Sequence, residues 1–281
     1  MLSKRLIIVS GKGGVGKSAV AAGIAMLAQR HSLRVLAVEM GSEGGLSAHF
    51  GTGPLEFASR EVRPGLHAMR IVRSEALLEY LSLQLRIPGM GRFGAVARAF
   101  DALATAAPAV REIITLGKVL WEVKEGRWDL VVADGPPTGQ IGSYLRAPVS
   151  IAELVPAGRI GSQAEWMRET LADPETTLVT LVTLPEELPA METAETLRWV
   201  EKANVVPTPM LIANRVLPPL KNSETPEGAV GDMANLHRAL RAEQQKWLEH
   251  LPPDLSIPFL FGLFTPGEVA ARLSEHLETA S

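Results

Sequence analysis

Eight consecutive residues near the N-terminus have the spacing of a phosphate-binding loop (P-loop). Residues 11–18 read Gly-Lys-Gly-Gly-Val-Gly-Lys-Ser, between a short apolar run and an alanine-rich helical pattern over 19–29. In this strand–loop–helix context the glycines let backbone N–H groups point at phosphate oxygens. Lys17 then reaches the β- and γ-phosphates, and the Ser18 hydroxyl ligates Mg²⁺. The predicted nucleotide-binding residues are Gly11, Lys12, Gly13, Gly14, Val15, Gly16, Lys17, Ser18 and Ala19.

A second lysine inside this loop narrows the prediction. Phosphate binding needs only Lys17, yet Lys12 directly follows the first glycine. A cation there cannot easily fold back onto its own phosphates, but it can reach a nucleotide held by a facing subunit, as an arginine finger does in trans. The alternative is a solvated loop lysine. The loop resembles the deviant Walker A motif of dimeric ATPases that drive partitioning, septum placement, nitrogenase reduction, and arsenite or tail-anchored protein traffic, which favours the trans role.

A further candidate, Asp134, ends an apolar run that begins at Trp128. In P-loop enzymes a carboxylate at such a strand end orients the Mg²⁺ shell, often through the loop hydroxyl. The next residues, 135–140, read Gly-Pro-Pro-Thr-Gly-Gln. This turn is stiff at its prolines and free at its glycines, so it can sense a γ-phosphate and move when that phosphate leaves. Ser18 and Asp134 are therefore the predicted metal-side pair.

The composition excludes several other kinds of site. The 281 residues include no cysteine, which rules out disulfides, thiolate zinc sites and iron–sulfur clusters. The net charge is −3 without a basic cluster, so no nucleic-acid partner is expected. No run approaches about 18 consecutive apolar residues, and the N-terminal apolar run is too short for a signal peptide. We therefore expect no integral membrane segment and a cytoplasmic protein.

Apolar runs separated by helical patterns predict the elements that position these residues. The runs are continuous rather than alternating, as suits parallel strands buried on both faces of a sheet. Strands that alternate with helices give a doubly wound α/β fold, with the ligand at the carboxyl ends of the strands. We expect one P-loop domain over residues 1–281. The predicted strands are Arg5–Val9, Arg34–Val38, Leu66–Val72, Leu130–Ala133, Thr177–Leu184, Met210–Ala213 and Ile257–Phe261.

Two insertions, 74–125 and 150–172, predict a helical subdomain beside the sheet. The first holds three helical patterns, whereas a simple crossover needs one helix. Such a layer can cover the sheet or bind a client, and apolar helical faces more often cover a core. Further along, the Pro- and Gly-rich stretch 217–231 predicts a mobile surface loop. The three apolar faces are Leu77, Leu81 and Leu85; Phe93, Val96, Ala97, Phe100 and Leu103; and Val110, Ile113, Ile114, Gly117 and Leu120.

Several segments from about residue 5 to residue 273 resemble the family of arsenite-pump ATPases and of ATPases that guide tail-anchored proteins to membranes. The turn after Asp134 is similar to the family's D-x-x-P-T-G-H second switch, with Gln140 where histidine is usual. The other matching segments are 108–118, 185–193, 212–215, 257–261 and 266–269. This resemblance implies a Mg²⁺-dependent, dimeric, ATP-binding protein. It also implies that Glu186 lies on the nucleotide side, that Asn214 hydrogen-bonds adenine, and that Pro258 belongs to a late loop that closes over the base.

The departures from the family pattern concern hydrolysis and the client. After the second strand the family has an aspartate that positions the attacking water, and Glu39 stands there, one methylene longer, before a glycine-rich loop. Because in-line attack is sensitive to displacements of about 1 Å, Glu39 is a working, a poor or a lost water-positioning residue. The Glu-type loop resembles a bacterial branch of the family whose genes tend to occur beside an Asp-type paralogue. Without cysteine the chain lacks the family's zinc clasp and metalloid site, and its insert over 154–176 is short for a client groove.

Three functions are consistent with these residues. The first is an ATPase whose homodimer or heterodimer opens and closes with ATP to act on a client or partner. The second is a weakly catalytic or non-catalytic ATP-binding subunit that regulates an Asp-type paralogue. The third is a partitioning or septum-placement ATPase, which would need a basic amphipathic C-terminal helix, whereas 268–281 holds one arginine and is expected to pack on the domain. The catalytic candidates are Lys12, Lys17, Glu39 and Asp134, and the metal ligands are Ser18 and Asp134.

Overall fold

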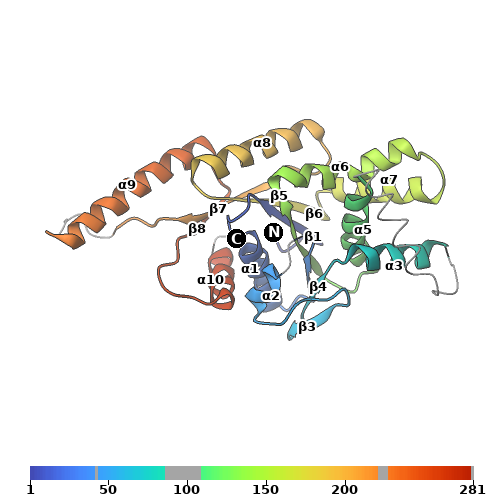
Figure 1. The fold of residues 1–281 in the computed structure, drawn as a ribbon, viewed down its shortest axis with the longest axis horizontal. Coiled ribbons are helices and arrows are strands. Elements are labelled where there is room, and N and C mark those ends of the chain that lie inside the picture. Colours follow the sequence, from blue (N-terminus) through green and yellow to red (C-terminus); the bar gives the residue numbers. More distant parts are fainter. Residues whose placement is uncertain (42–43, 86–108, 221–226, 280–281) are drawn as a thin grey trace.

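The computed structural model describes residues 1–41, 44–85, 109–220 and 227–279, and an eight-stranded sheet forms its centre (Figure 1). The strand order is β3-β4-β2-β5-β1-β6-β7-β8, and all neighbours are parallel except β3 and β4. This confirms the predicted doubly wound, mostly parallel α/β fold. The strands are β1 Leu6–Gly11, β2 Val35–Glu39, β3 Arg60–Arg63, β4 Leu66–Arg70, β5 Leu130–Pro137, β6 Thr177–Thr183, β7 Met210–Val216 and β8 Leu255–Pro258.

Helices cover both faces of the sheet, because successive strand residues point to opposite sides. Ile7 and Val9 of β1 belong to one apolar core, and Leu6 and Ile8 belong to the other. The first core packs under α1 (Lys17–Arg30), α2 (Gly45–Phe50) and α10 (Pro266–Thr279), as Figure 1 shows. The second packs under α5 (Ala109–Glu125), α6 (Thr138–Leu154), α7 (Gly158–Ala172) and α8 (Glu187–Ala203). Burial on both faces explains why the strands are apolar throughout.

The sheet brings the candidate site residues together at the carboxyl ends of its parallel strands. β1 lies between β5 and β6, with β2 beyond β5 and β7 beyond β6. The P-loop follows β1, Glu39 ends β2, Asp134 lies in the second half of β5, and Asn214 lies near the end of β7. In a doubly wound sheet, ligands bind outside the carboxyl ends of the strands where the strand order reverses. β1 is that reversal point.

Several sequence predictions differ from the structure. The strand expected over Leu130–Ala133 runs to Pro137, so residues 135–137, expected in a turn, continue β5, which pairs with β1 as far as Pro137. The last strand, expected over Ile257–Phe261, is Leu255–Pro258, because β8 pairs with β7 only up to Pro258 and the chain then leaves the sheet. The edge strand β3 was not predicted, because its four residues alternate in burial and pair antiparallel with β4. The loop expected over 217–231 ends early, since α9 (Ala229–His250) begins inside it.

The helical layer of the structure consists of α3 (Arg73–Leu85) and α5 packed beside α6 and α7. The middle apolar pattern, from Phe93 to Leu103, lies outside the described residues, so the bounds 74–125 and 150–172 remain predictions. An apolar cavity of about 370 Å³ opens between these four helices. Leu77 of the first predicted apolar face, Ile114 of the third and Met167 of α7 line it.

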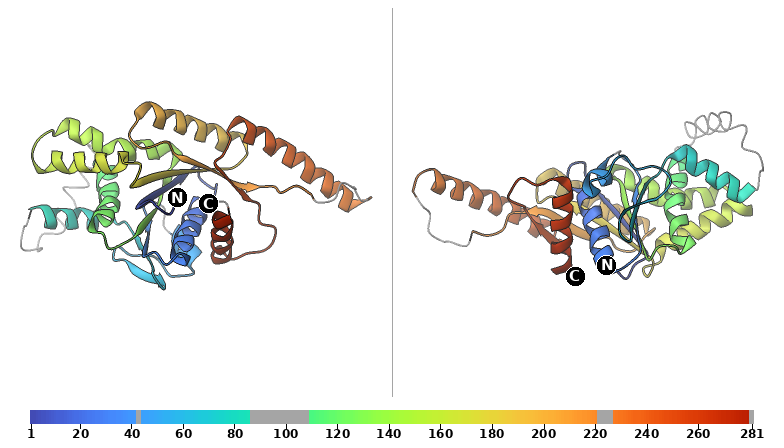
Figure 2. Two further views of the ribbon diagram at one scale, coloured as in Figure 1. Left: turned by 180° about the vertical axis from the view of Figure 1, so that it is seen from behind. Right: turned by 90° about the horizontal axis from the view of Figure 1, so that it is seen from below.

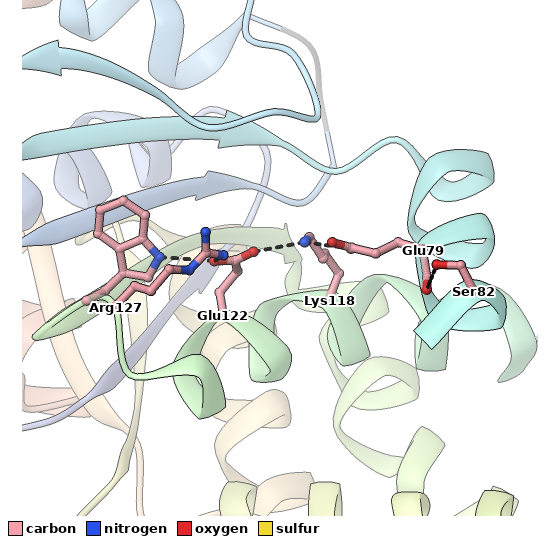
Figure 3. Close-up of polar contacts among 6 residues, drawn as sticks. Glu79, Ser82, Lys118, Glu122 and Arg127 are labelled. Atoms are coloured by element: carbon pink, nitrogen blue, oxygen red, sulfur yellow. Dashed lines mark hydrogen bonds and ion pairs between the residues drawn. The ribbon is translucent and has the colours of Figure 1, made fainter. Parts of the chain in front are cut away.

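A chain of ion pairs fastens α3 to α5 (Figure 3). Lys118 Nζ on α5 lies 2.6 Å from Glu79 Oε2 on α3 and 2.8 Å from Glu122 Oε1. Glu122 also accepts hydrogen bonds from Arg127 at 2.8 Å and from the Trp128 indole at 3.0 Å. Burial acts to raise the pKa of Glu122, but the hydrogen bonds and charges of these partners outweigh it, so the pKa lies below its ordinary value. The helical layer is thus tied to the start of β5 by charge as well as by apolar packing.

Replacing Lys118 by methionine is expected to lower the free energy of unfolding by about 2 kcal/mol, because Glu122 then stays buried with one charged partner fewer. Urea unfolding followed by circular dichroism measures the change. The control is Lys202→Met on α8, where the lysine is exposed and the expected change lies within about 0.5 kcal/mol. Equal losses in the two variants would contradict a structural role for this ion-pair chain.

The last two helices differ in how they meet the body of the fold. The apolar face of α10 (Ala270, Leu273 and Leu277) is buried against α1, as the sequence predicted for this tail. In contrast, α9 extends beyond the β7–β8 edge as a long arm in both views of Figure 2. In the parts of the chain that the structure describes, no helix has both the length and the apolarity needed to cross a bilayer. Exposed apolar side chains on the arm are Val230, Met233, Leu236 and Leu240.

Candidate functional site

The P-loop has the shape that its glycines predict. At Gly11 a side-chain Cβ would overlap the carbonyl oxygen of Val182 on β6, and at Gly16, where φ is +94°, it would lie 2.5 Å from Asn214 Nδ2. Gly13 and Gly14 are exposed and have no heavy atom near a would-be Cβ. Two glycines therefore let the loop approach the sheet and β7, and two leave its outer rim open for a ligand.

Lys17 is the first residue of α1 and lies inside the loop. Its Nζ donates a hydrogen bond to the Lys12 carbonyl oxygen at 3.2 Å. Burial lowers the pKa of Lys17, and the nearby Asp134 carboxylate partly offsets that effect. A half-buried ammonium beside exposed backbone N–H groups at a helix N-terminus is well suited to bind phosphate oxygens.

Ser18 and Asp134 form the predicted metal-side pair. The Ser18 hydroxyl donates to Asp134 Oδ2 at 2.6 Å. Burial raises the pKa of Asp134 to about 6 against the Ser18 hydrogen bond and the Lys17 charge, and the Glu39 charge adds to the rise. The other oxygen, Asp134 Oδ1, is buried and has no hydrogen-bond partner among the described residues. A hydroxyl and a carboxylate with an unused buried oxygen are hard oxygen donors, so these residues fit a Mg²⁺ ion.

Glu39 lies against the same pair. Its Cα is the register partner of Asp134 between β2 and β5, and its side chain is only 1% exposed. Glu39 Oε1 accepts the backbone N–H of Leu46 at 2.8 Å, whereas Oε2 is buried and has no hydrogen-bond partner in the described part of the chain. A Cβ on Gly45 would lie 2.6 Å from Ser18 Oγ, so the start of α2 directly covers the pair. Glu39 thus holds this helix start beside the metal-side residues.

The residues expected around the base occupy different positions. Asn214 is buried, and its Nδ2 donates to the Val15 carbonyl oxygen at 2.9 Å, which braces the P-loop from β7. Glu186 is exposed at the N-cap of α8. Pro258 ends β8 beside Val216 of β7. The structure therefore brings Asn214 to the loop, while the roles of Glu186 and Pro258 toward a nucleotide remain predictions.

Glu192 is a residue of the site that was not predicted from the sequence. Lys12 forms an ion pair with Glu192 Oε1 on α8, and the Thr138 hydroxyl donates to Glu192 Oε2 at 3.4 Å. Glu192 belongs to the family-like segment 185–193, but no role was assigned to it. A half-exposed carboxylate within a matching segment was the signal available, and only the folded chain shows that it faces Lys12.

Comparison with known proteins identifies the family. The sequence profile of the anion-transporting ATPase (ArsA) family matches residues 4–157 and 158–251. The chain belongs to the ArsA ATPase family. Nucleotide binding, which the P-loop predicted, is a property of this family.

Three relatives indicate how far the similarity extends. ATPase BagA of Mycobacterium tuberculosis is 33% identical over 229 residues, which are 76% of this chain and 66% of that protein. The arsenical pump-driving ATPase of Escherichia coli is 29% identical over 211 residues, 74% of this chain and 34% of that protein. ATPase get3 of Sclerotinia sclerotiorum is 23% identical over 320 aligned positions, 99% of this chain and 90% of that protein. The chain thus spans about two thirds of the length of its mycobacterial ArsA-family relative.

Proposed function

We propose that this ArsA-family chain is a Mg²⁺-dependent ATPase that works as a dimer closed over its nucleotides. The observation that carries the proposal is the convergence of Lys17, Ser18 and Asp134 at the P-loop, with Ser18 and Asp134 joined at 2.6 Å. Lys12 belongs to the same loop, yet its side chain is held on α8 and not beside Lys17. In the proposed dimer, Lys17 binds the phosphates of its own subunit, and Lys12 acts on those of the facing subunit.

Each residue then has a separate task. The exposed backbone of Gly13 and Gly14 and the Lys17 ammonium bind the phosphates, and Ser18 and Asp134 hold the metal ion. When bound, Mg²⁺ supplies positive charge that neutralises charge developing on the transferred phosphoryl group. Lys12 of the facing subunit adds a second positive charge there, as an arginine finger does.

The same proposal assigns the base and the client. Asn214, which already anchors Val15, hydrogen-bonds adenine with its remaining amide capacity. Glu186, at the N-cap of α8, and Pro258, at the end of β8, border the nucleotide in this proposal. The helical layer over α3, α5, α6 and α7 opens and closes with nucleotide state and acts on a client or a partner subunit. Its apolar cavity supports this assignment.

A second candidate function rests on Glu39. Its Oε1 accepts the Leu46 N–H, and the residue is only 1% exposed. A carboxylate used as an anchor is a poor water-positioning residue, and one methylene of extra length adds to the misplacement. The chain would then bind ATP with little turnover and act as the regulatory half of a heterodimer with an Asp-type paralogue.

The proposal predicts that purified protein hydrolyses ATP only with Mg²⁺ and that Lys17→Ala, Lys12→Ala and Glu39→Ala each lower turnover at least about tenfold. Lys12→Ala is the most informative variant, because its effect must appear only where two subunits meet. Phosphate release at several protein concentrations, with mass in solution from light scattering, measures both quantities. Lys124→Ala, an exposed lysine on α5, is the control.

The outcomes separate the two candidates. Turnover that rises with protein concentration, in particles of twice the monomer mass, supports the self-sufficient dimer. Tight ATP binding without turnover, and no further loss in Glu39→Ala, supports the regulatory subunit. An enzyme that stays monomeric and active, with no effect of Lys12→Ala, would contradict the trans role of Lys12.

A further inference from the structure

The Glu192 carboxylate connects two parts of the nucleotide site through its two oxygens. Oε1 pairs with the Lys12 ammonium from the P-loop, and Oε2 accepts the Thr138 hydroxyl at 3.4 Å. Lys12 lies between β1 and α1, whereas Thr138 is the first residue of α6. One side chain on α8 therefore holds the loop cation and the start of the switch helix together.

Each partner of Glu192 leads directly to phosphate-binding or metal-side groups. The Lys12 carbonyl oxygen accepts Lys17 Nζ, so the backbone and the side chain of Lys12 are both engaged within the subunit. Thr138 is buried and follows Asp134 by four residues at the end of β5. Movement of Glu192 would therefore shift Lys12, which contacts Lys17, and Thr138, which lies close to Asp134 in the sequence.

The ion pair between Lys12 and Glu192 can separate with little loss of stability. The side chains of Lys12 and Glu192 are 29% and 41% exposed, and half-exposed ion pairs add little to stability. An open cleft of about 660 Å³ between α6 and α8 borders the pair, lined by Thr138, Gly142, Glu192 and Trp199. The side chains therefore have room to move without unpacking the core. A nucleotide triphosphate carries more negative charge than one carboxylate and can outcompete it for an ammonium.

We infer that Glu192 is a positioning residue that keeps Lys12 within its own subunit until the triphosphate of a nucleotide on a second copy of this chain takes the lysine. The inference rests on the proposed dimeric ATPase and adds the group that controls its trans lysine. When Lys12 leaves, Glu192 loses its cation, and its hydrogen bond to Thr138 is the remaining tie to α6. Capture of Lys12 in trans is thereby coupled to the switch helix of the subunit that provides it.

The holding role is tested without ATP. An amine-acetylating reagent is added to nucleotide-free protein, and the modified peptides are quantified by mass spectrometry. Lys12 is expected to react about threefold faster in Glu192→Gln than in the wild type, because the lost ion pair frees the amine. The matched control is Glu195→Gln, an exposed glutamate three residues further along α8, which should leave the Lys12 rate unchanged. Equal Lys12 rates in the wild type and Glu192→Gln overturn the inference.

The release is tested by assembly. With Mg²⁺ and a non-hydrolysable ATP analogue, Glu192→Gln should dimerise at about threefold lower protein concentration than the wild type, and Glu195→Gln should match the wild type. Glu192→Asp keeps the charge and should fall between the two. Dimerisation unchanged or weakened by Glu192→Gln overturns the release role. If the labelling differs but no variant forms a nucleotide-driven dimer, the dimeric ATPase is overturned while the holding role of Glu192 stands.

Discussion

Replacing Asp134 by asparagine is expected to lower ATP turnover about a thousandfold and to make the nucleotide-free protein more stable. Turnover falls because the carboxylate is lost from the metal side. Stability rises because burial raises the pKa of Asp134 from its ordinary value of 3.8 to about 6, so the ionised form is disfavoured in the fold. At about pH 7.5 that difference corresponds to about 3 kcal/mol of unfolding free energy. Phosphate release and urea unfolding measure the two effects.

The pH dependence gives the prediction its sign. Between about pH 4 and pH 6 the folded protein binds the Asp134 proton more tightly than the unfolded chain, so the free energy of unfolding falls as the pH rises through this window. Asp134→Asn removes that slope, and the variant gains on the wild type until about pH 6. Asp129→Asn is the control of opposite sign, because hydrogen bonds from Arg34 lower the pKa of Asp129 to about 2. If the free energy of unfolding changed with pH in the same way for the wild type and Asp134→Asn, a raised pKa of Asp134 in the folded protein would be contradicted.

The sheet and the phosphate end of the site could be predicted because local sequence determines both. The predicted phosphate-binding residues of the P-loop lie within nine consecutive positions, and Asp134 follows an apolar run in β5. Continuous burial of β1, with Leu6 and Ile8 in one core and Ile7 and Val9 in the other, leaves little choice but a covered parallel strand.

The elements that were missed lie where local pattern is weak. β3 is an edge strand whose residues are half-buried or exposed, so neither period nor hydrophobicity marks it. α9 has one buried residue, Gly231, and its apolar side chains Val230, Met233, Leu236 and Leu240 are exposed, so they do not form the core-facing side that usually reveals a helix. The start of α9 follows glycine, which was interpreted as part of a loop.

Contacts between distant residues could not be predicted at all. Lys12 and Glu192 are 180 residues apart, and Asn214 and Val15 are 199 apart. The sequence supplied the residue types, and the family resemblance supplied a role for Asn214 toward adenine. Only the folded chain shows that Asn214 donates a hydrogen bond to the Val15 carbonyl oxygen of the P-loop and that Glu192 on α8 pairs with Lys12.

Gly11→Ala is expected to lower the free energy of unfolding by about 4 kcal/mol, the largest stability effect predicted for this chain. At φ +156° a Cβ on Gly11 would overlap the Val182 carbonyl oxygen and lie 2.9 Å from Val15 Cγ2. Gly11 and Val182 are register partners in the β1–β6 ladder, so neither backbone can move without breaking the centre of the sheet. Urea unfolding monitored by circular dichroism measures the loss.

Gly13→Ala is the matched control, because a Cβ at Gly13 meets no heavy atom within 4 Å. Its free energy of unfolding should stay within about 0.5 kcal/mol of the wild type. Nucleotide affinity should nevertheless fall, since the added methyl group occupies the rim where phosphates approach, and a fluorescent ATP analogue reports this. Glycine would then be required for different reasons at the two positions, backbone packing at Gly11 and ligand approach at Gly13. Equal stability losses in the two variants would contradict this, because the contact between Gly11 and Val182 would then not be the cause of the loss.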